Sequence, residues 1–312
     1  DSSNVEKPRR TVTRKYGRIN GFYGPESSEA DENITTFENS IQEFIHSARG
    51  SAHGVALDGE LAGSFVAHLE MRSLFLRTEM SNIASRIAGL LRTTLQTKSK
   101  SAQIANSYLK NHPELIEEQL DELGVFGIER GTAREMISST LPQLADQAGE
   151  ELRLKGQALF GLLEDIIPKI AENAHNKALT GDFAETERAA QHRKLTYAIY
   201  RSESGSFILP DTCVAFISNA GCTPVTSKSH RPELTIAPIS TEVAIVGKAS
   251  GSFERDEKTM QRVLASSAYQ NFLAPTQSGA LERLARKIGS NAKLISNADL
   301  IKMVSDETLL NL

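Results

Sequence analysis

The chain has 312 residues and a formal net charge of -4 at pH 7, with 24% charged and 39% hydrophobic residues. This balance is typical of an ordinary globular protein and excludes a largely disordered chain. Proteins that mainly coat duplex nucleic acid usually carry a basic surplus that neutralises phosphates, and this chain has no such surplus overall.

The first 28 residues are expected to form a basic arm followed by a short strand. Six basic and two acidic residues give residues 1–24 a local charge of +4. The Lys7–Arg18 part of this arm could contact an acidic partner or nucleic acid, although terminal charge runs are more often simply solvated. The N-terminus has no apolar signal core, and no segment reaches the roughly 18 uncharged apolar residues of a membrane-spanning helix. We therefore expect a cytoplasmic protein that does not contact a membrane.

Residues 29–200 are predicted to form mostly a helical bundle. One helix covers about Ile34 to Ala48, where four apolar residues lie on one face. Asp58 can cap a second helix, which we expect to continue without a break from Gly59 to about Thr97. Helical periodicity then continues to a stop at Gly181-Asp182.

Residues 201–312 are predicted to form a small antiparallel sheet with C-terminal helices, and together with the bundle one composite domain. Aromatic and β-branched residues indicate strands, and Ser218 to Gly221 indicates a hairpin turn. The expected strands are Leu195–Arg201, Ser206–Ile217, Glu233–Ala237 and Glu242–Val246, and the expected helices are Asp256–Leu273, Gly279–Ile288 and Ala298–Leu310. The fold class is therefore α+β, mainly a helical bundle with a small antiparallel sheet in the C-terminal half.

The two cysteines, Cys213 and Cys222, fit no common metal motif, so we expect free thiols in a reducing compartment. In a four-residue hairpin loop Ile217 faces Cys222, which would place Cys213 opposite Thr226. This register separates the two cysteines along the ladder and argues against a disulfide.

The segment FVAHLEMRSLFLRTEM, from Phe65 to Met80, raises the main functional question. On a helix, His68 and Arg72 lie one turn apart at the border of the apolar face, in line with Glu79 and Arg86. One interpretation is a polar edge whose members pair with neighbouring helices. The other is a cleft in which His68 carries protons and Arg72 clamps an anion.

Asp211 is the third candidate for chemistry. A carboxylate between Phe207-Ile208 and Val214 would be costly to bury without partners, so it must face solvent, hold a metal or meet a cation such as Arg72 or Arg201. We expect His192, at a polar helix end, to be solvated. Motifs such as HExxH or a phosphate loop are missing, and we expect neither a cofactor nor a metal.

Several stretches resemble a large bacterial family, number 4238 among the domains of unknown function. Phe65 to Ser73 resembles its F-[IV]-A helix, Phe22-Tyr23 and Glu38 resemble its FY pair and acidic helix, and Phe207 to Val214 resembles its F-I-T-S-D-x-P-V strand. Leu74, Pro210 and Cys213 depart from the family pattern. The resemblance implies an α+β fold. Tyr23, Glu38, Arg77 and Arg201 are the candidate binding residues.

We expect a bacterial or phage protein with a binding or regulatory function. The alternative is a hydrolase of nucleic acid or nucleotides, with His68 as acid/base, Arg72 as anion clamp and Asp211 as a metal or His partner. Whether the chain is an enzyme stays open at this point.

Overall fold

The computed structural model describes residues 22–23, 28–112, 114, 117, 130–182, 185–219, 221–226, 231–251 and 256–292. It confirms the α+β fold class. Spatial contacts group the chain into unit 1 (Asp1–Met80 and Glu172–Leu294) and unit 2 (Ser81–Ala171 and Ile295–Leu312), a division that differs from the expected one at residues 28 and 200.

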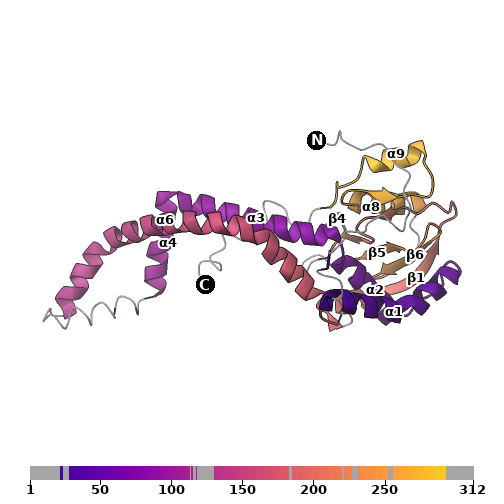
Figure 1. The fold of residues 1–312 in the computed structure, drawn as a ribbon, viewed down its shortest axis with the longest axis horizontal. Coiled ribbons are helices and arrows are strands. Elements are labelled where there is room, and N and C mark those ends of the chain that lie inside the picture. The colour runs from indigo at the N-terminus through magenta and orange to yellow at the C-terminus, as the bar shows by residue number, and fades with distance from the viewer. Residues whose placement is uncertain are drawn as a thin grey trace. The chain divides into compact units, whose positions relative to one another are not determined.

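Unit 1 contains an antiparallel sheet whose strands follow the order β1-β6-β5-β3-β4 (Figure 1). Its strands are β1 (Thr196–Arg201), β3 (Ala215–Ser218), β4 (Gly221–Thr223), β5 (Leu234–Pro238) and β6 (Val243–Lys248). A separate two-stranded sheet joins β2 (Leu209–Pro210) to β7 (Phe272–Leu273). The β3–β4 hairpin pairs Ile217 with Cys222, as predicted.

Helices cover both faces of the larger sheet (Figure 1). Alternate residues of a strand point to opposite faces. In β6, Ala244 and Val246 therefore pack toward α8 (Glu257–Ser267) and α9 (Gly279–Ala285), whereas Val243 and Ile245 pack toward α1 (Glu29–Gly50) and α2 (Gly59–Met71). Because both faces are buried, β5 and β6 show little polar alternation in their sequences.

The outer edge of β1 is covered by a short segment between α1 and α2. The N–H of Gly54 donates to the carbonyl of Ile199 at 2.8 Å, and the N–H of Leu57 donates to Tyr197 at 3.0 Å. Ile199 donates in turn to Val55 at 2.9 Å. At the other edge, β4 is three residues long.

The helices of unit 1 begin at side-chain caps, which satisfy backbone N–H groups that lack a partner within the helix. Asp58 caps α2, Thr186 caps α7 (Glu187–His192) and Asp256 caps α8. The cap that was predicted at Asp58 is therefore confirmed.

Unit 2 contains most of α3 (Leu74–Gln96) and α6 (Arg130–Ala178), together with α4 (Lys98–Asn111). Ala88 of α3 packs against Phe160 and Ile167 of α6. The opposite side of α6 carries exposed apolar side chains, namely Leu154, Leu162, Ile166 and Ile170. None of the helices in the described ranges has an apolar stretch long enough to cross a bilayer.

The predicted continuous helix from Gly59 to Thr97 is wrong, because it is interrupted between α2 and α3. Ser73 stabilises this break from both sides. Its hydroxyl donates to the carbonyl of Glu70 at 3.0 Å and accepts from the N–H of Leu76 at 3.2 Å. The break means that the predicted stripe of His68, Arg72, Glu79 and Arg86 does not lie on one helix.

Two further boundaries differ from the prediction. The expected strand from Ser206 to Ile217 is divided by a turn in which Cys213 has a φ of 61°, so Cys213 lies outside the ladder and does not pair with Thr226. Helix α8 ends at Ser267, before β7. The basic arm with its short strand and the helix expected at Ala298–Leu310 lie outside the described residues.

Replacing Gly63 by Ala should destabilise the protein by about 1–3 kcal/mol, because the added methyl group overpacks the contact of α2 with α7. A Cβ at Gly63 would lie 2.8 Å from the backbone nitrogen of Arg193. Gly59→Ala is the matched control on the same helix, where the nearest atoms would be 3.9 Å away. Urea unfolding measures both variants, and equal stability would contradict the close packing inferred here.

Candidate functional site

The last turn of α2 places three ionisable side chains in different surroundings. His68 and Glu70 are 1% and 0% exposed, and Arg72 is the C-cap residue of the helix. Burying charged groups is costly unless they are paired and hydrogen-bonded. The partners of these three residues therefore decide what the segment can do.

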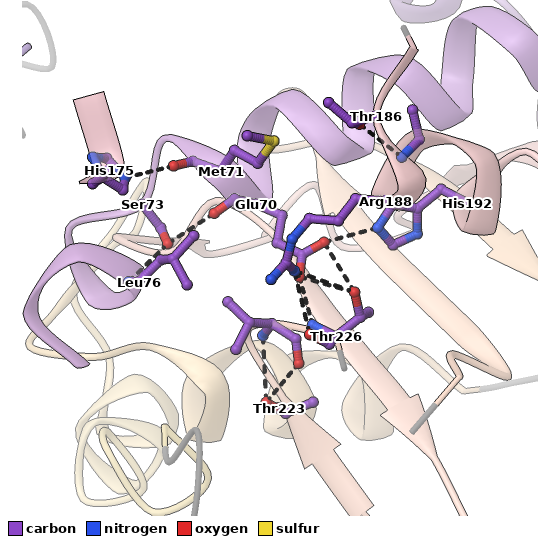
Figure 2. Close-up of polar contacts among 12 residues, drawn as sticks. Glu70, Met71, Ser73, Leu76, His175, Thr186, Arg188, His192, Thr223 and Thr226 are labelled. Atoms are coloured by element: carbon purple, nitrogen blue, oxygen red, sulfur yellow. Dashed lines mark hydrogen bonds and ion pairs between the residues drawn. The ribbon is translucent and has the colours of Figure 1, made fainter. Parts of the chain in front are cut away.

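Glu70 is surrounded by donors from two other segments (Figure 2). Its carboxylate accepts from Arg188 and, at 2.8 Å, from Nε2 of His192. The backbone N–H and the hydroxyl of Thr226 donate to the same carboxylate at 2.5 and 2.9 Å. The network therefore links α2, α7 and the segment that follows β4.

The local sequence explains how α7 delivers its two partners. Arg188 and His192 are four residues apart and lie on the same face of that helix. Gly63 allows the backbone at Arg193 to approach α2 closely. The ring of His192 also stacks on Phe216 at 5.1 Å.

The environment of Glu70 keeps it ionised. Burial raises the pKa of this carboxyl. The charge of Arg188 and the hydrogen bonds from His192 and Thr226 lower the pKa by more than burial raises it, so the pKa lies below its ordinary value. Both carboxylate oxygens already accept hydrogen bonds from groups of the protein, so we interpret Glu70 as a structural residue.

Arg72 lies in a second cluster, with Tyr23, Glu38 and His68. Its Nε donates to the Tyr23 hydroxyl at 3.0 Å, and its Nη1 donates to Glu38 and lies 3.1 Å from Nε2 of His68. The Arg72 side chain is 29% exposed and that of Glu38 is 42% exposed. Three of the four candidate binding residues, Tyr23, Glu38 and Arg77, thus lie in or beside this cluster.

The tautomer of His68 follows from its neighbours. A guanidinium has no acceptor, so Nε2 of His68 accepts from Arg72 and the proton of the neutral ring is on Nδ1. Burial, together with the charge of Arg72, holds the pKa of His68 below its ordinary value and outweighs the opposing effect of Glu38. The ring also packs against Phe37 at 4.5 Å.

The guanidinium of Arg72 is held in place on one side only. Nε and Nη1 have the partners given above, whereas Nη2 donates to none of the residues that the structure describes. Burial lowers the pKa of Arg72, but Tyr23 and Glu38 raise it by more, so the side chain stays charged. The contacts with Tyr23, Glu38 and His68 thus leave one nitrogen of the charged guanidinium without an acceptor among the described residues.

Arg77 and His175 form a third cluster beside Phe22 and Tyr23. The guanidinium of Arg77 lies 3.9 Å from the centre of the Phe22 ring, and its Nε lies 3.3 Å from Nδ1 of His175. Nε2 of His175 donates to the carbonyl of Met71, the last residue of α2, at 2.8 Å (Figure 2). Burial, then the Arg77 charge, lowers the pKa of His175 from 6.5 to about 4.

The carboxylate of Asp211 is held by backbone groups of the turn that follows α8. Its carboxylate accepts from the backbone N–H groups of Tyr269, Gln270 and Asn271 at 2.7, 2.7 and 3.1 Å. Burial raises its pKa against these hydrogen bonds. Asp211 therefore closes the turn after α8 and meets neither Arg72 nor Arg201.

Arg201 also has a structural position. Its Nε and Nη2 donate to the carbonyls of Ser51 and Arg49 at 2.8 and 2.7 Å, at the C-terminal end of α1. These carbonyls lack partners within the helix, so Arg201 stabilises its end. Its remaining charged partner is Glu242, at 3.9 Å, so none of these contacts is with the Arg72 cluster.

Both cysteines are free, as expected. The thiol of Cys213 is influenced by the charges of Arg72 and Asp211, which lower and raise its pKa respectively. Burial raises its pKa more than Arg72 lowers it. A raised pKa keeps the thiol protonated and poorly nucleophilic.

Sequence reasoning missed all four residues of the Glu70 network, namely Glu70, Arg188, His192 and Thr226. His192 was expected to be solvated and is 0% exposed, and Glu70 was not a candidate. The only available signal was the spacing of Arg188 and His192 on one helical face. Among the described residues, no group of three or more His, Cys, Asp or Glu side chains could hold a metal ion.

No family model matches the chain, and neither the curated proteins nor the solved structures contain a significant match to it. The function is therefore argued from the site alone.

Replacing Glu70 by Gln should lower the free energy of unfolding by about 3 kcal/mol, because Arg188 loses the buried charge with which it pairs. Glu43→Gln, on the exposed side of α1, removes the same charge and should have little effect. Denaturant unfolding at pH 7 measures both. A small effect at Glu70 would show that its network contributes little to the fold.

The free energy of unfolding, measured at different pH values, should show the effect of the lowered pKa of His175. The pKa of the ring is about 4 in the folded state and 6.5 as the ordinary value. As the pH falls, the ring therefore binds a proton in the unfolded chain at a higher pH than in the folded protein. Its contribution to stability is complete above pH 6.5 and is lost as the pH falls toward 4. His175→Gln should flatten this part of the parent's pH profile, and an unchanged slope would contradict the assignment.

Proposed function

We propose that this chain is a binding protein that recognises an anionic group through Arg72. The observation that carries the proposal is the state of its guanidinium. Two of its three nitrogens are held by partners, while Nη2 has none among the described residues. Arg is well suited to carboxylate and phosphate groups because its planar donors match their oxygens.

The surroundings of Arg72 support a binding role. Tyr23 and His68 orient the guanidinium before any ligand arrives, which reduces the entropy lost on binding. The side chain is charged and about one-third exposed, so a small anion can reach it. The buried His68 lies beside a charged guanidinium and has a lowered pKa, and groups with perturbed pKa values are common at functional sites.

The contacts of His68 and Asp211 do not support the hydrolase alternative. A general base needs a lone pair that faces its substrate, and the Nε2 lone pair of His68 faces Arg72. Asp211 was to bind a metal or orient the histidine, but three backbone N–H groups already occupy its carboxylate.

The proposal keeps the wider expectations from the sequence. These are membership of the bacterial family of unknown function number 4238, a bacterial or phage source, a regulatory role and a cytoplasmic location, the last in line with two free thiols. A contact of the Lys7–Arg18 arm with an acidic partner or nucleic acid remains a separate prediction.

Titration with inorganic phosphate, at ionic strength held constant with chloride, tests the proposal. The parent should show saturable chemical-shift changes in amide NMR spectra around Tyr23, Glu38 and Arg72. Arg72→Gln should weaken phosphate binding about tenfold or more, because charge-assisted hydrogen bonds to the anion are lost.

Arg77→Gln is the matched control, since it removes a guanidinium that is already paired with Glu172 and stacked on Phe22. Thermal unfolding of both variants verifies that they fold. Equal phosphate affinity of the parent and folded Arg72→Gln would sink the proposal, as would a loss that is the same in both variants.

A further inference from the structure

We propose that Glu38 is a built-in competitor for the anion at Arg72, and that the ligand able to displace it is a phosphate monoester in its dianionic form. This inference rests on the proposed function, because it concerns the same guanidinium. It adds the class of ligand and a residue that sets its affinity.

The competition follows from which donors are occupied. Glu38 accepts from Nη1 of Arg72, and Nη2 donates to no described residue. A ligand that binds the end of the guanidinium takes one N–H from each of these two nitrogens. Nη1 has two N–H groups, which donate to Glu38 and His68, so the second oxygen of the ligand must take the place of one of these two acceptors.

Among the partners of Arg72, Glu38 is the one that can leave. Its side chain is 42% exposed and comes from the surface of α1, whereas the side chain of His68 is 2% exposed. Ion pairs between partly exposed groups are weak, so a ligand needs only several-fold stronger binding to replace one. Tyr23 and His68 would keep the guanidinium oriented after Glu38 has moved away.

A carboxylate ligand gains little from this exchange. It would replace a carboxylate that is tethered to the protein and therefore present at a high effective concentration. A phosphate dianion brings more charge and a third acceptor oxygen. The Tyr23 hydroxyl, which accepts from Nε at 3.0 Å, has its own proton available for that oxygen, since it donates to no residue in the described ranges.

The experiment compares methyl phosphate with acetate on the full chain, by NMR titration at neutral pH and constant ionic strength. Glu38→Gln keeps the size of the side chain and removes its charge. It should bind methyl phosphate roughly three to five times more tightly than the parent, in line with the weak pair that it removes. Glu43→Gln, on the same helix, should leave the affinity unchanged.

Glu38→Asp separates contact from long-range charge, because it keeps the charge but withdraws the carboxylate from Nη1. Direct competition predicts tighter binding of methyl phosphate in this variant too, by less than in Glu38→Gln. If Glu38→Gln binds no more tightly than the parent, or if Glu38→Asp equals the parent, the competitor role is wrong. Acetate binding as tight as methyl phosphate binding would overturn the ligand class.

Failure of this inference can be distinguished from failure of the proposed function. Phosphate binding that depends on Arg72 but not on Glu38 removes only the competitor. Phosphate binding that is missing from the parent and from Glu38→Gln, or that persists in the double variant with Arg72→Gln, removes both.

Discussion

The geometry of unit 1 depends on one fully buried carboxylate. Glu70 stays ionised where it has no access to water, because donors from α7 and from Thr226 replace its hydration. An unpaired charge at this depth would be far more costly than any single apolar contact could offset. The donors must therefore be in place whenever the chain is folded, which fixes α2 relative to α7 and to the end of the β3–β4 hairpin.

The break in the helix after Met71 divides this polar segment into two parts with different roles. Before the break, Glu70 points into the fold and is satisfied completely. At the break, Arg72 leaves the helical direction, and Ser73 and His175 satisfy the carbonyls of Glu70 and Met71. This arrangement lets a rigid, buried cluster support a cation that is still partly accessible, two residues further along the chain.

Local rules were enough to predict the fold class, the α2 cap at Asp58 and the pairing of Ile217 with Cys222. The cap and the hairpin pairing depend on residues that are close in the sequence. The Glu70 network could not be predicted, because its donors lie 118 and 156 residues away. For the same reason His192, on a short helix of polar appearance, was wrongly expected to be solvated. Asp211 was expected to face solvent, hold a metal or meet a cation, whereas it binds backbone N–H groups. The Arg72 cluster is intermediate. Spacing placed His68 beside Arg72, and the family resemblance had made Tyr23 and Glu38 candidate binding residues, but only the fold brings the four side chains together.

The way the sheet ends has a consequence for how the protein behaves in concentrated solution. Exposed strand edges offer unpaired backbone groups to which other chains can add, and this is a common route to aggregation. Here β1 is already hydrogen-bonded by residues 54–57, and β4 is three residues long. The larger sheet therefore offers a second molecule little backbone to extend, so association by strand addition is disfavoured although its strands are rich in β-branched residues.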